Sequence, residues 1–161
     1  MNPIEIENKL KSQSYIEPEM IEAAFDFWFA DRDHIRSPFP VYIRETLRLS
    51  AIDKFLSWSS QISEKAKKDI NDEILAEKLE EIIFELALDM VLTEDEKLTI
   101  HYPFLARVGD VLEDKNAPAG ASESKIIDRW LVKREDNTFM KVKLKNTSLD
   151  EEWETEFELP E

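Results

Sequence analysis

The chain has 161 residues, 42% of them hydrophobic, and its 36 acidic residues outnumber 21 basic ones to give a net charge of −15. This length fits one domain, and the apolar share argues against a disordered chain. The acidic balance argues against nonspecific binding to nucleic acid or anionic lipid, which depends on lysine and arginine. With no cysteine, no membrane-length apolar run and no signal-peptide pattern, we expect a soluble cytoplasmic protein.

Two helices are predicted in the N-terminal part. Residues 1–16 are polar and are expected to form a frayed or docked tail. A helix should begin at Pro18, because proline suits the first helical turn, and its apolar positions follow helical spacing. Pro38 and Pro40 then break the chain, and apolar residues from about 41 to 62 predict a second, longer helix.

The stretch 72–92 predicts the central helix of the fold. Its main apolar stripe is Leu75, Leu79, Ile82, Ile83, Leu86 and Met90. Phe84, Leu88 and Leu92 add a second apolar face, so we expect N-terminal helices on one side and C-terminal strands on the other. Thr93 and Glu96 fit a capping box, which predicts a short helix through about residue 100.

The C-terminal part predicts antiparallel strands. Gly109–Asp110 should form a turn or bulge, residues 113–124 form a loop, and strands are expected near 125–134, 138–145 and 152–159. Lysine alternates with apolar residues in the second strand and glutamate does so in the third. Antiparallel pairing then places Lys145, Lys143 and Lys141 opposite Glu152, Glu154 and Glu156. The hairpin before it should turn near 136–137, but its register is left open.

These elements predict an α+β fold. About three helices (about 17–101) should pack on an antiparallel meander of three to four strands (about 105–159), within a single compact domain over 1–161. A separately folded small barrel that begins near 107–110 is the alternative.

The sequence offers little for catalysis. Asp31, Asp33 and His34 form one polar cluster and His101 lies far along the chain, so a metal-dependent enzyme is a minor alternative. Glutamates at four-residue steps on the central helix, such as Glu77 and Glu81, are read as a solvated face. No serine lies in a nucleophile elbow, and two glycines cannot build a phosphate-binding loop, so no cofactor is expected.

One segment departs from the acidic background. All bases between residues 12 and 53 are arginines, and Arg44 and Arg48 share a helix face at a four-residue step. Arginine binds carboxylate or phosphate through two parallel hydrogen bonds. We therefore hypothesise an anion-binding patch formed by His34, Arg36, Arg44 and Arg48. The alternative is that these arginines pair with acids of the chain itself.

The leading functional interpretation is a noncatalytic adaptor or interaction protein with a basic protein partner. The acidic surface, the scarcity of catalytic side chains and an available sheet edge favour it. A binder of a small anion at the arginine segment is the second interpretation.

Overall fold

The computed structural model describes residues 3–5, 8, 18–31, 36–113, 123–146 and 150–160. The chain divides into two compact units, the helical unit (Met1–Pro103) and the β unit (Phe104–Glu161). Because packed helices precede an antiparallel sheet, the predicted α+β class is confirmed. Cooperation of both units in one folding domain stays a prediction.

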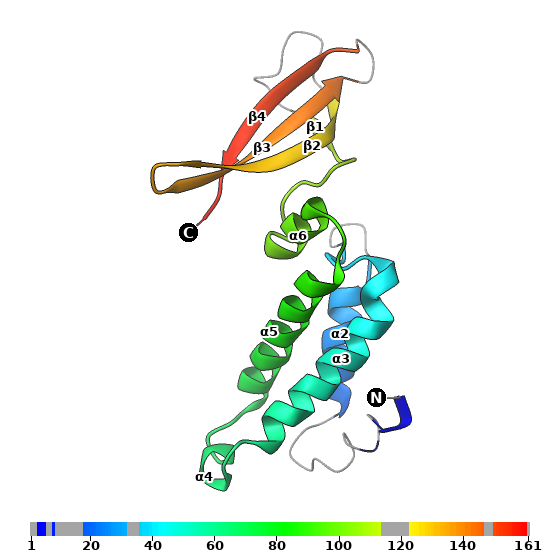
Figure 1. Cartoon of the computed structure of the whole chain (residues 1–161), viewed down its shortest axis with the longest axis vertical. Helices are drawn as coiled ribbons and strands as arrows, with labels where there is room; N and C mark the ends of the chain where they lie inside the picture. Colours follow the sequence, from blue (N-terminus) through cyan, green and yellow to red (C-terminus); the bar gives the residue numbers. More distant parts are fainter. Residues whose placement is uncertain are drawn as a thin grey trace. The chain divides into compact units, whose positions relative to one another are not determined.

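The helices of the helical unit lie where the apolar spacing predicts them. They are α2 (Pro18–Phe29), α3 (Val41–Ser60), α4 (Glu64–Lys67), α5 (Asp72–Met90) and α6 (Glu94–His101) (Figure 1). Helices α3 and α5 end at Ser60 and Met90, slightly before the predicted ends at residues 62 and 92. The backbone of Val91 is already extended, at φ −81° and ψ 156°, so helical geometry cannot continue beyond Met90.

Side-chain caps define where three of the helices begin. Ser63 accepts a hydrogen bond from the Ala66 amide at the start of α4, and Asn71 accepts one from the Ile74 amide at the start of α5. Thr93 and Glu96 form the predicted capping box at the start of α6. Each cap satisfies amides that lack a partner within the helix, which stabilises a helix by about 1 kcal/mol.

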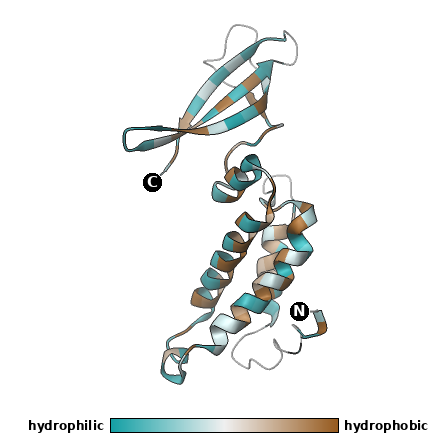
Figure 2. Ribbon diagram, viewed as in Figure 1, coloured by the Kyte–Doolittle hydropathy of each residue, from teal (hydrophilic) through white to brown (hydrophobic). Residues whose placement is uncertain are grey.

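The core of the helical unit lies between α2, α3 and α5. The predicted stripe of α5 is largely confirmed, since Leu75, Leu79 and Ile82 are at most 2% exposed. Figure 2 shows how apolar residues recur at helical steps along α3 and α5. Of the predicted second face, Phe84 is covered from within the helical unit, whereas Leu92 is 82% exposed. That strands cover this face stays a prediction.

An aromatic cluster covers Phe84. The Phe84 ring lies 4.8 Å from Trp28 of α2 and 5.0 Å from Phe39, which precedes α3, in both cases edge to face. Phe39 is 1% exposed and also contacts Phe29, at 5.8 Å between ring centroids. Edge-to-face pairs add about 0.5–1.5 kcal/mol each beyond the burial of their area. The proline-bounded Phe39 therefore joins α2, α3 and α5.

The β unit is an antiparallel meander with the strand order β1-β2-β3-β4. Its strands are β1 (Val111–Glu113), β2 (Glu123–Arg134), β3 (Asn137–Asn146) and β4 (Glu152–Glu158) (Figure 1). Gly109 precedes β1 with φ 98°, which fits the predicted turn. The β2–β3 turn is Glu135–Asp136, one residue earlier than expected, and Glu135 adopts φ 55°.

The predicted register of β3 and β4 is confirmed at all three lysines, and Leu144, Val142 and Met140 lie opposite Trp153, Thr155 and Phe157. The side chains nevertheless pair diagonally. Lys141 contacts Glu154 at 3.4 Å, and Lys143 contacts Glu152 at 3.1 Å. Each lysine thus reaches the glutamate two residues before the one directly opposite it.

A β-bulge explains why the register of β2 is hard to predict. Pairing with β3 shifts between Ile126 and Asp128, so the alternation of β2 changes phase within the strand. Beyond the bulge, Arg129 takes an inward position, where it is 4% exposed and donates a hydrogen bond to the Ala106 carbonyl at 2.9 Å.

Among the described residues, no helix combines the length and apolar character that crossing a membrane requires.

Candidate functional site

The predicted anion patch lies at the junction of α2 and α3. His34 falls outside the residues that the structure describes. Arg36 is exposed and lies just before α3, whereas Arg44 and Arg48 lie on α3 itself. Helical spacing puts Arg44 and Arg48 on one face, as predicted, but each contacts a different acidic residue of the chain.

Arg44 closes the connection between α2 and α3. Its Nη2 contacts the Asp31 carboxylate at 3.0 Å, and its Nε donates to the Phe39 carbonyl at 2.9 Å. The other oxygen of Asp31 accepts the Ser37 amide at 3.0 Å. The Ser37 hydroxyl in turn donates to the Trp28 carbonyl and accepts the Phe39 amide. These bonds hold the chain before Phe39 against the end of α2.

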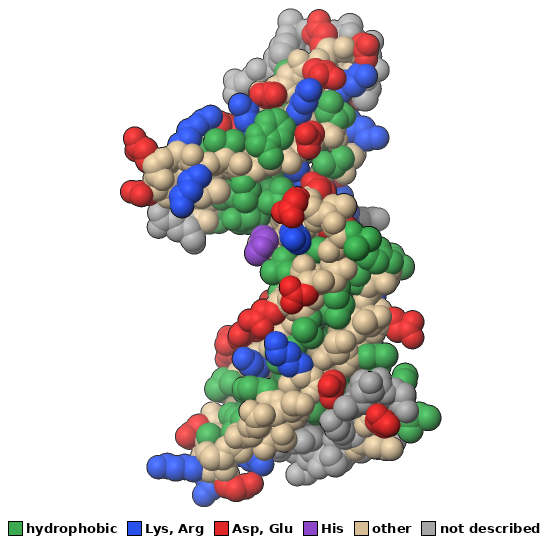
Figure 3. All heavy atoms as spheres, in the orientation of Figure 1, with side chains coloured by type: hydrophobic (Ala, Val, Ile, Leu, Met, Phe, Trp, Pro, Cys, Tyr) green, Lys and Arg blue, Asp and Glu red, His purple; other side chains and the backbone are tan. Residues whose placement is uncertain are grey.

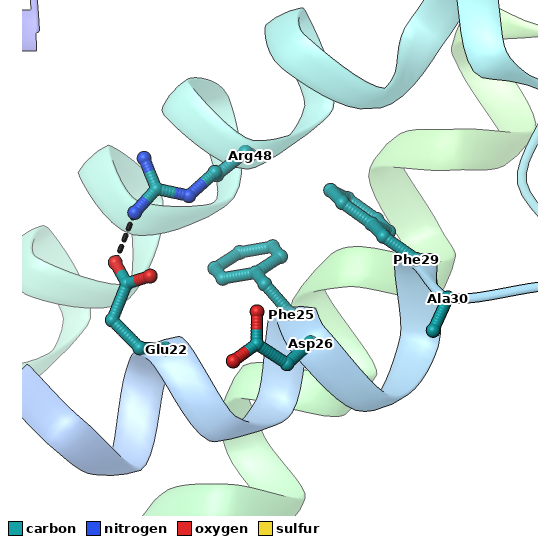
Figure 4. Close-up of a pocket in the computed structure, with 6 residues that line it drawn as sticks. All are labelled: Glu22, Phe25, Asp26, Phe29, Ala30 and Arg48. Atoms are coloured by element: carbon teal, nitrogen blue, oxygen red, sulfur yellow. Dashed lines mark hydrogen bonds and ion pairs between the residues drawn. The ribbon is translucent and has the colours of Figure 1, made fainter.

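Arg48 forms one wall of a pocket between α2 and α3. The pocket has a volume of about 310 Å³ and is lined by Glu22, Phe25, Asp26, Phe29, Ala30 and Arg48 (Figure 4). The Arg48 guanidinium pairs with the Glu22 carboxylate and lies 5.7 Å from the centre of the Phe25 ring. The pocket residues of α2 include two acids, one turn apart.

The pocket is a poor receptor for an anion as it stands. An anion that approached Arg48 would have to displace the Glu22 carboxylate and would also meet Asp26. Both contacts oppose negative charge in the same small volume. The contacts of Arg44 and Arg48 therefore favour internal pairing, and anion binding stays a prediction that competition with phosphate can test.

The residues named for a metal site are only partly described. Asp33 and His34 lie outside the described residues, Asp31 contacts Arg44, and His101 is exposed in the last turn of α6. Within the described ranges, no three histidine, aspartate or glutamate side chains gather in a way that could hold a metal ion. A metal-dependent enzyme has no further support from the geometry.

The described part of the helical unit carries an extended acidic row on α5. The row consists of residues at successive four-residue steps, all exposed: Glu73, Glu77, Glu81, Glu85 and Asp89. Figure 3 shows acidic side chains along this exposed side of α5, with basic side chains among them. Lys78 contacts Glu81 at 3.4 Å and Lys54 contacts Glu85 at 3.5 Å.

Three members of the acidic row have no basic partner among the described residues: Glu73, Glu77 and Asp89. Glu80 lies beside the row, and partial burial together with the nearby charge of Glu77 raises the pKa of its carboxyl group. Burial is the larger of the two causes, and the charge of Glu77 adds to it in the same direction.

Glu77 and Glu81 stand out from the sequence as a solvated face of the central helix, whereas the full row from Glu73 to Asp89 emerges only with the structure. The signal was present as an unbroken four-residue period from Glu73 to Asp89 on a helix whose opposite side is apolar.

Comparisons of this chain with protein-family models, with curated proteins and with solved structures each gave no match, so a proposal of function must rest on the chain's own residues.

Proposed function

We propose that this chain is a noncatalytic interaction protein that binds a protein partner with a basic surface. The observation that supports the proposal is the acidic row of α5. Its carboxylates recur once per helical turn from Glu73 to Asp89, over a length of about 24 Å at 1.5 Å per residue. A basic helix or strand of a partner could contact several of them at once.

Repulsion between neighbouring acids of the row opposes formation of the helix that carries them. Two acids at a four-residue step repel each other and destabilise a helix by about 0.2–0.5 kcal/mol per pair. Glu73 and Glu77 form such a pair, and neither has a basic partner among the described residues. Positive charge from a partner would relieve this repulsion, so binding should stabilise α5 while it neutralises the row.

The charge pattern also suits recognition rather than catalysis. Exposed carboxylates in a row attract a basic partner over a distance and orient it as it approaches, which mainly raises the rate of association. The contribution of each exposed contact is small, about 0.2–1 kcal/mol, so affinity requires several contacts together.

A matched pair of variants tests this proposal with a labelled octalysine peptide as the probe. The row variant carries Glu73→Gln, Glu77→Gln and Asp89→Asn. The control variant loses the same charge at other exposed acids of the helical unit: Glu19→Gln, Glu45→Gln and Asp69→Asn. Fluorescence anisotropy at several salt concentrations reports the affinity of each.

We expect the row variant to bind the peptide about tenfold more weakly than the wild type, with a smaller salt dependence, if each lost contact contributes about 0.5 kcal/mol. The control variant should lose much less. Equal losses in both variants would mean that only net charge matters, and the proposal for the α5 row would be rejected.

A further inference from the structure

Within the described residues, the outer edge of β4 combines unpaired backbone groups with a row of alternating glutamates. β4 is the last strand in the sheet order, and no strand among the described residues pairs with its outer side. Proline, lysine and β-bulges commonly protect the edge of a sheet. The seven residues of β4 contain none of these three features. Backbone groups on this edge are therefore available to an extended segment.

Two hydrogen bonds establish which backbone groups face outward. The Asn146 amide donates to the Glu151 carbonyl and the Leu159 amide donates to the Thr138 carbonyl, both at 2.8 Å. In an antiparallel ladder, hydrogen-bonded pairs alternate with pairs that do not share hydrogen bonds. The residues of β4 that point their backbone groups toward β3 are thus Trp153, Thr155 and Phe157. The residues that alternate with these three, all of them glutamates, point their backbone groups outward.

The outward backbone groups therefore belong to Glu152, Glu154, Glu156 and Glu158. Their side chains share one face of the sheet, the face that carries the lysines of β3. A second copy of β4 would place glutamates beside glutamates, and this repulsion opposes self-association. A segment with lysine or arginine at alternate positions would instead meet a complementary row.

β3 shows in this same molecule what such a segment looks like. It presents Lys141, Lys143 and Lys145 to the β4 glutamates, and Met140, Val142 and Leu144 to the opposite face. On that opposite face, Phe157 of β4 is 38% exposed and offers apolar contact to a neighbouring strand. Glu152 and Glu154 contact lysines of β3, and Glu156 contacts Arg134 of β2 at 2.6 Å. The three glutamate side chains nevertheless stay 47%, 45% and 36% exposed, which leaves each of them surface for a second basic contact.

We propose that the outer edge of β4 binds an extended partner segment in which basic and apolar residues alternate, as an added strand of the sheet. This mode of recognition uses main-chain hydrogen bonds for affinity and alternate side chains for specificity. The inference rests on the proposed function for the basic character of the partner, and adds the conformation of the partner and the place where it docks.

The probe for this proposal is a fluorescein-labelled peptide with the sequence of residues 138–146, TFMKVKLKN. The control peptide has the same composition with its three lysines consecutive, which removes the alternation. Amide hydrogen exchange measured by NMR on the wild-type protein gives the first readout. The TFMKVKLKN peptide should slow exchange of the Glu154 and Glu156 amides, and the control peptide should not.

Glu154→Pro and Glu154→Ala form the decisive pair of variants. Both remove the same charge, but only proline removes an outward amide, and it leaves the hydrogen bonds to β3 in place because Glu154 does not donate to β3. We expect Glu154→Pro to bind the peptide about tenfold more weakly than Glu154→Ala does, the loss of roughly one hydrogen bond plus a steric clash.

Two outcomes would overturn the assignment. Equal affinities of the two variants, with unchanged exchange of the Glu154 amide in the wild type, would show that the edge takes no strand. A wild-type dimer that Glu154→Pro separates would make a second copy the occupant. The exchange readout needs no variant, so it remains decisive if Glu154→Pro fails to fold.

Failure here can be distinguished from failure of the proposed function. If octalysine binding depends on the α5 row while the β4 edge takes no peptide, the basic partner docks without strand addition. If the edge binds and the row variant behaves like its control, the basic partner is recognised at β4 alone.

Discussion

Replacing Arg44 by alanine should separate a structural role from anion binding. The ion pair of Arg44 with Asp31 contributes well under 1 kcal/mol, because the Asp31 side chain is 55% exposed and solvent screens it. The partly buried hydrogen bond to the Phe39 carbonyl adds about 1 kcal/mol, and packing of the arginine stem, which is mostly covered, adds to it. Arg44→Ala should therefore destabilise the helical unit by about 1–2 kcal/mol.

Thermal unfolding followed by far-UV circular dichroism can resolve this change, since 1 kcal/mol shifts the Tm of a unit of this size by about 4–8 °C. Arg48→Ala is the matched control. Its ion pair with Glu22 joins two exposed side chains, and its guanidinium covers the ring of Phe25, which is 3% exposed. The loss should be about 0.5–1 kcal/mol, smaller than for Arg44→Ala.

Phosphate, compared with chloride at matched ionic strength, completes the test. If internal pairing is the role of Arg44, phosphate should change the Tm of the wild type and of Arg44→Ala equally or not at all. The reasoning would be refuted by an Arg44→Ala protein that is as stable as the wild type, together with a phosphate-dependent rise in Tm that only the wild type shows.

Two further predictions concern charged contacts. Reversing the charges of Lys143 and Glu152 together should restore most of the stability that is lost on reversing either one, whereas Lys143 and Glu154 should show little coupling. Double-mutant cycles in urea should find coupling energies for the two pairs that differ by about 0.5 kcal/mol. Stronger coupling of the directly opposite pair, Lys143 and Glu154, would contradict the diagonal contacts. Burial alone would raise the pKa of Glu96, but hydrogen bonds from Tyr42 and Thr93 outweigh it and hold that pKa below its ordinary value. Ionised Glu96 therefore stabilises the helical unit at pH values above its pKa in the unfolded chain, and this contribution is lost as the pH falls through its pKa in the folded protein. The Tm difference between wild type and Glu96→Gln should consequently shrink in acid. A Tm difference that does not depend on pH would exclude this role.

The parts of the fold that could be predicted are those in which neighbouring residues carry the information. The β3–β4 register follows from two alternating patterns of opposite charge, and a one-residue shift would place every lysine on the apolar face. The capping box of α6 needs only Thr93 and Glu96. In both cases the deciding contacts lie within a hairpin or a single helical turn.

The parts that could not be predicted depend on contacts between distant residues. The bulge after Ile126 adds one residue to a strand of mixed composition, where no alternation reveals it. The shared face of Arg44 and Arg48 follows from helical spacing, but their partners Asp31 and Glu22 come from elsewhere in the chain. In a chain with so many acids, spacing alone cannot show which arginines already have partners.

The acidic excess is distributed differently in the two charged features, and this difference bears on how a partner would bind. In the sheet, lysines of β3 lie beside the glutamates of β4 and offset much of their charge. The β4 edge would therefore bind a partner mainly through its outward backbone groups, whose hydrogen bonds are directional. On α5, three of the five acids in the row have no basic partner among the described residues, so that helix contributes charge without direction. The charge of the α5 row attracts a partner and speeds its association, whereas main-chain hydrogen bonds at the β4 edge select the sequence and conformation of the partner. Variants of α5 should consequently change the rate of association with a basic partner, and variants of β4 should change the rate of dissociation.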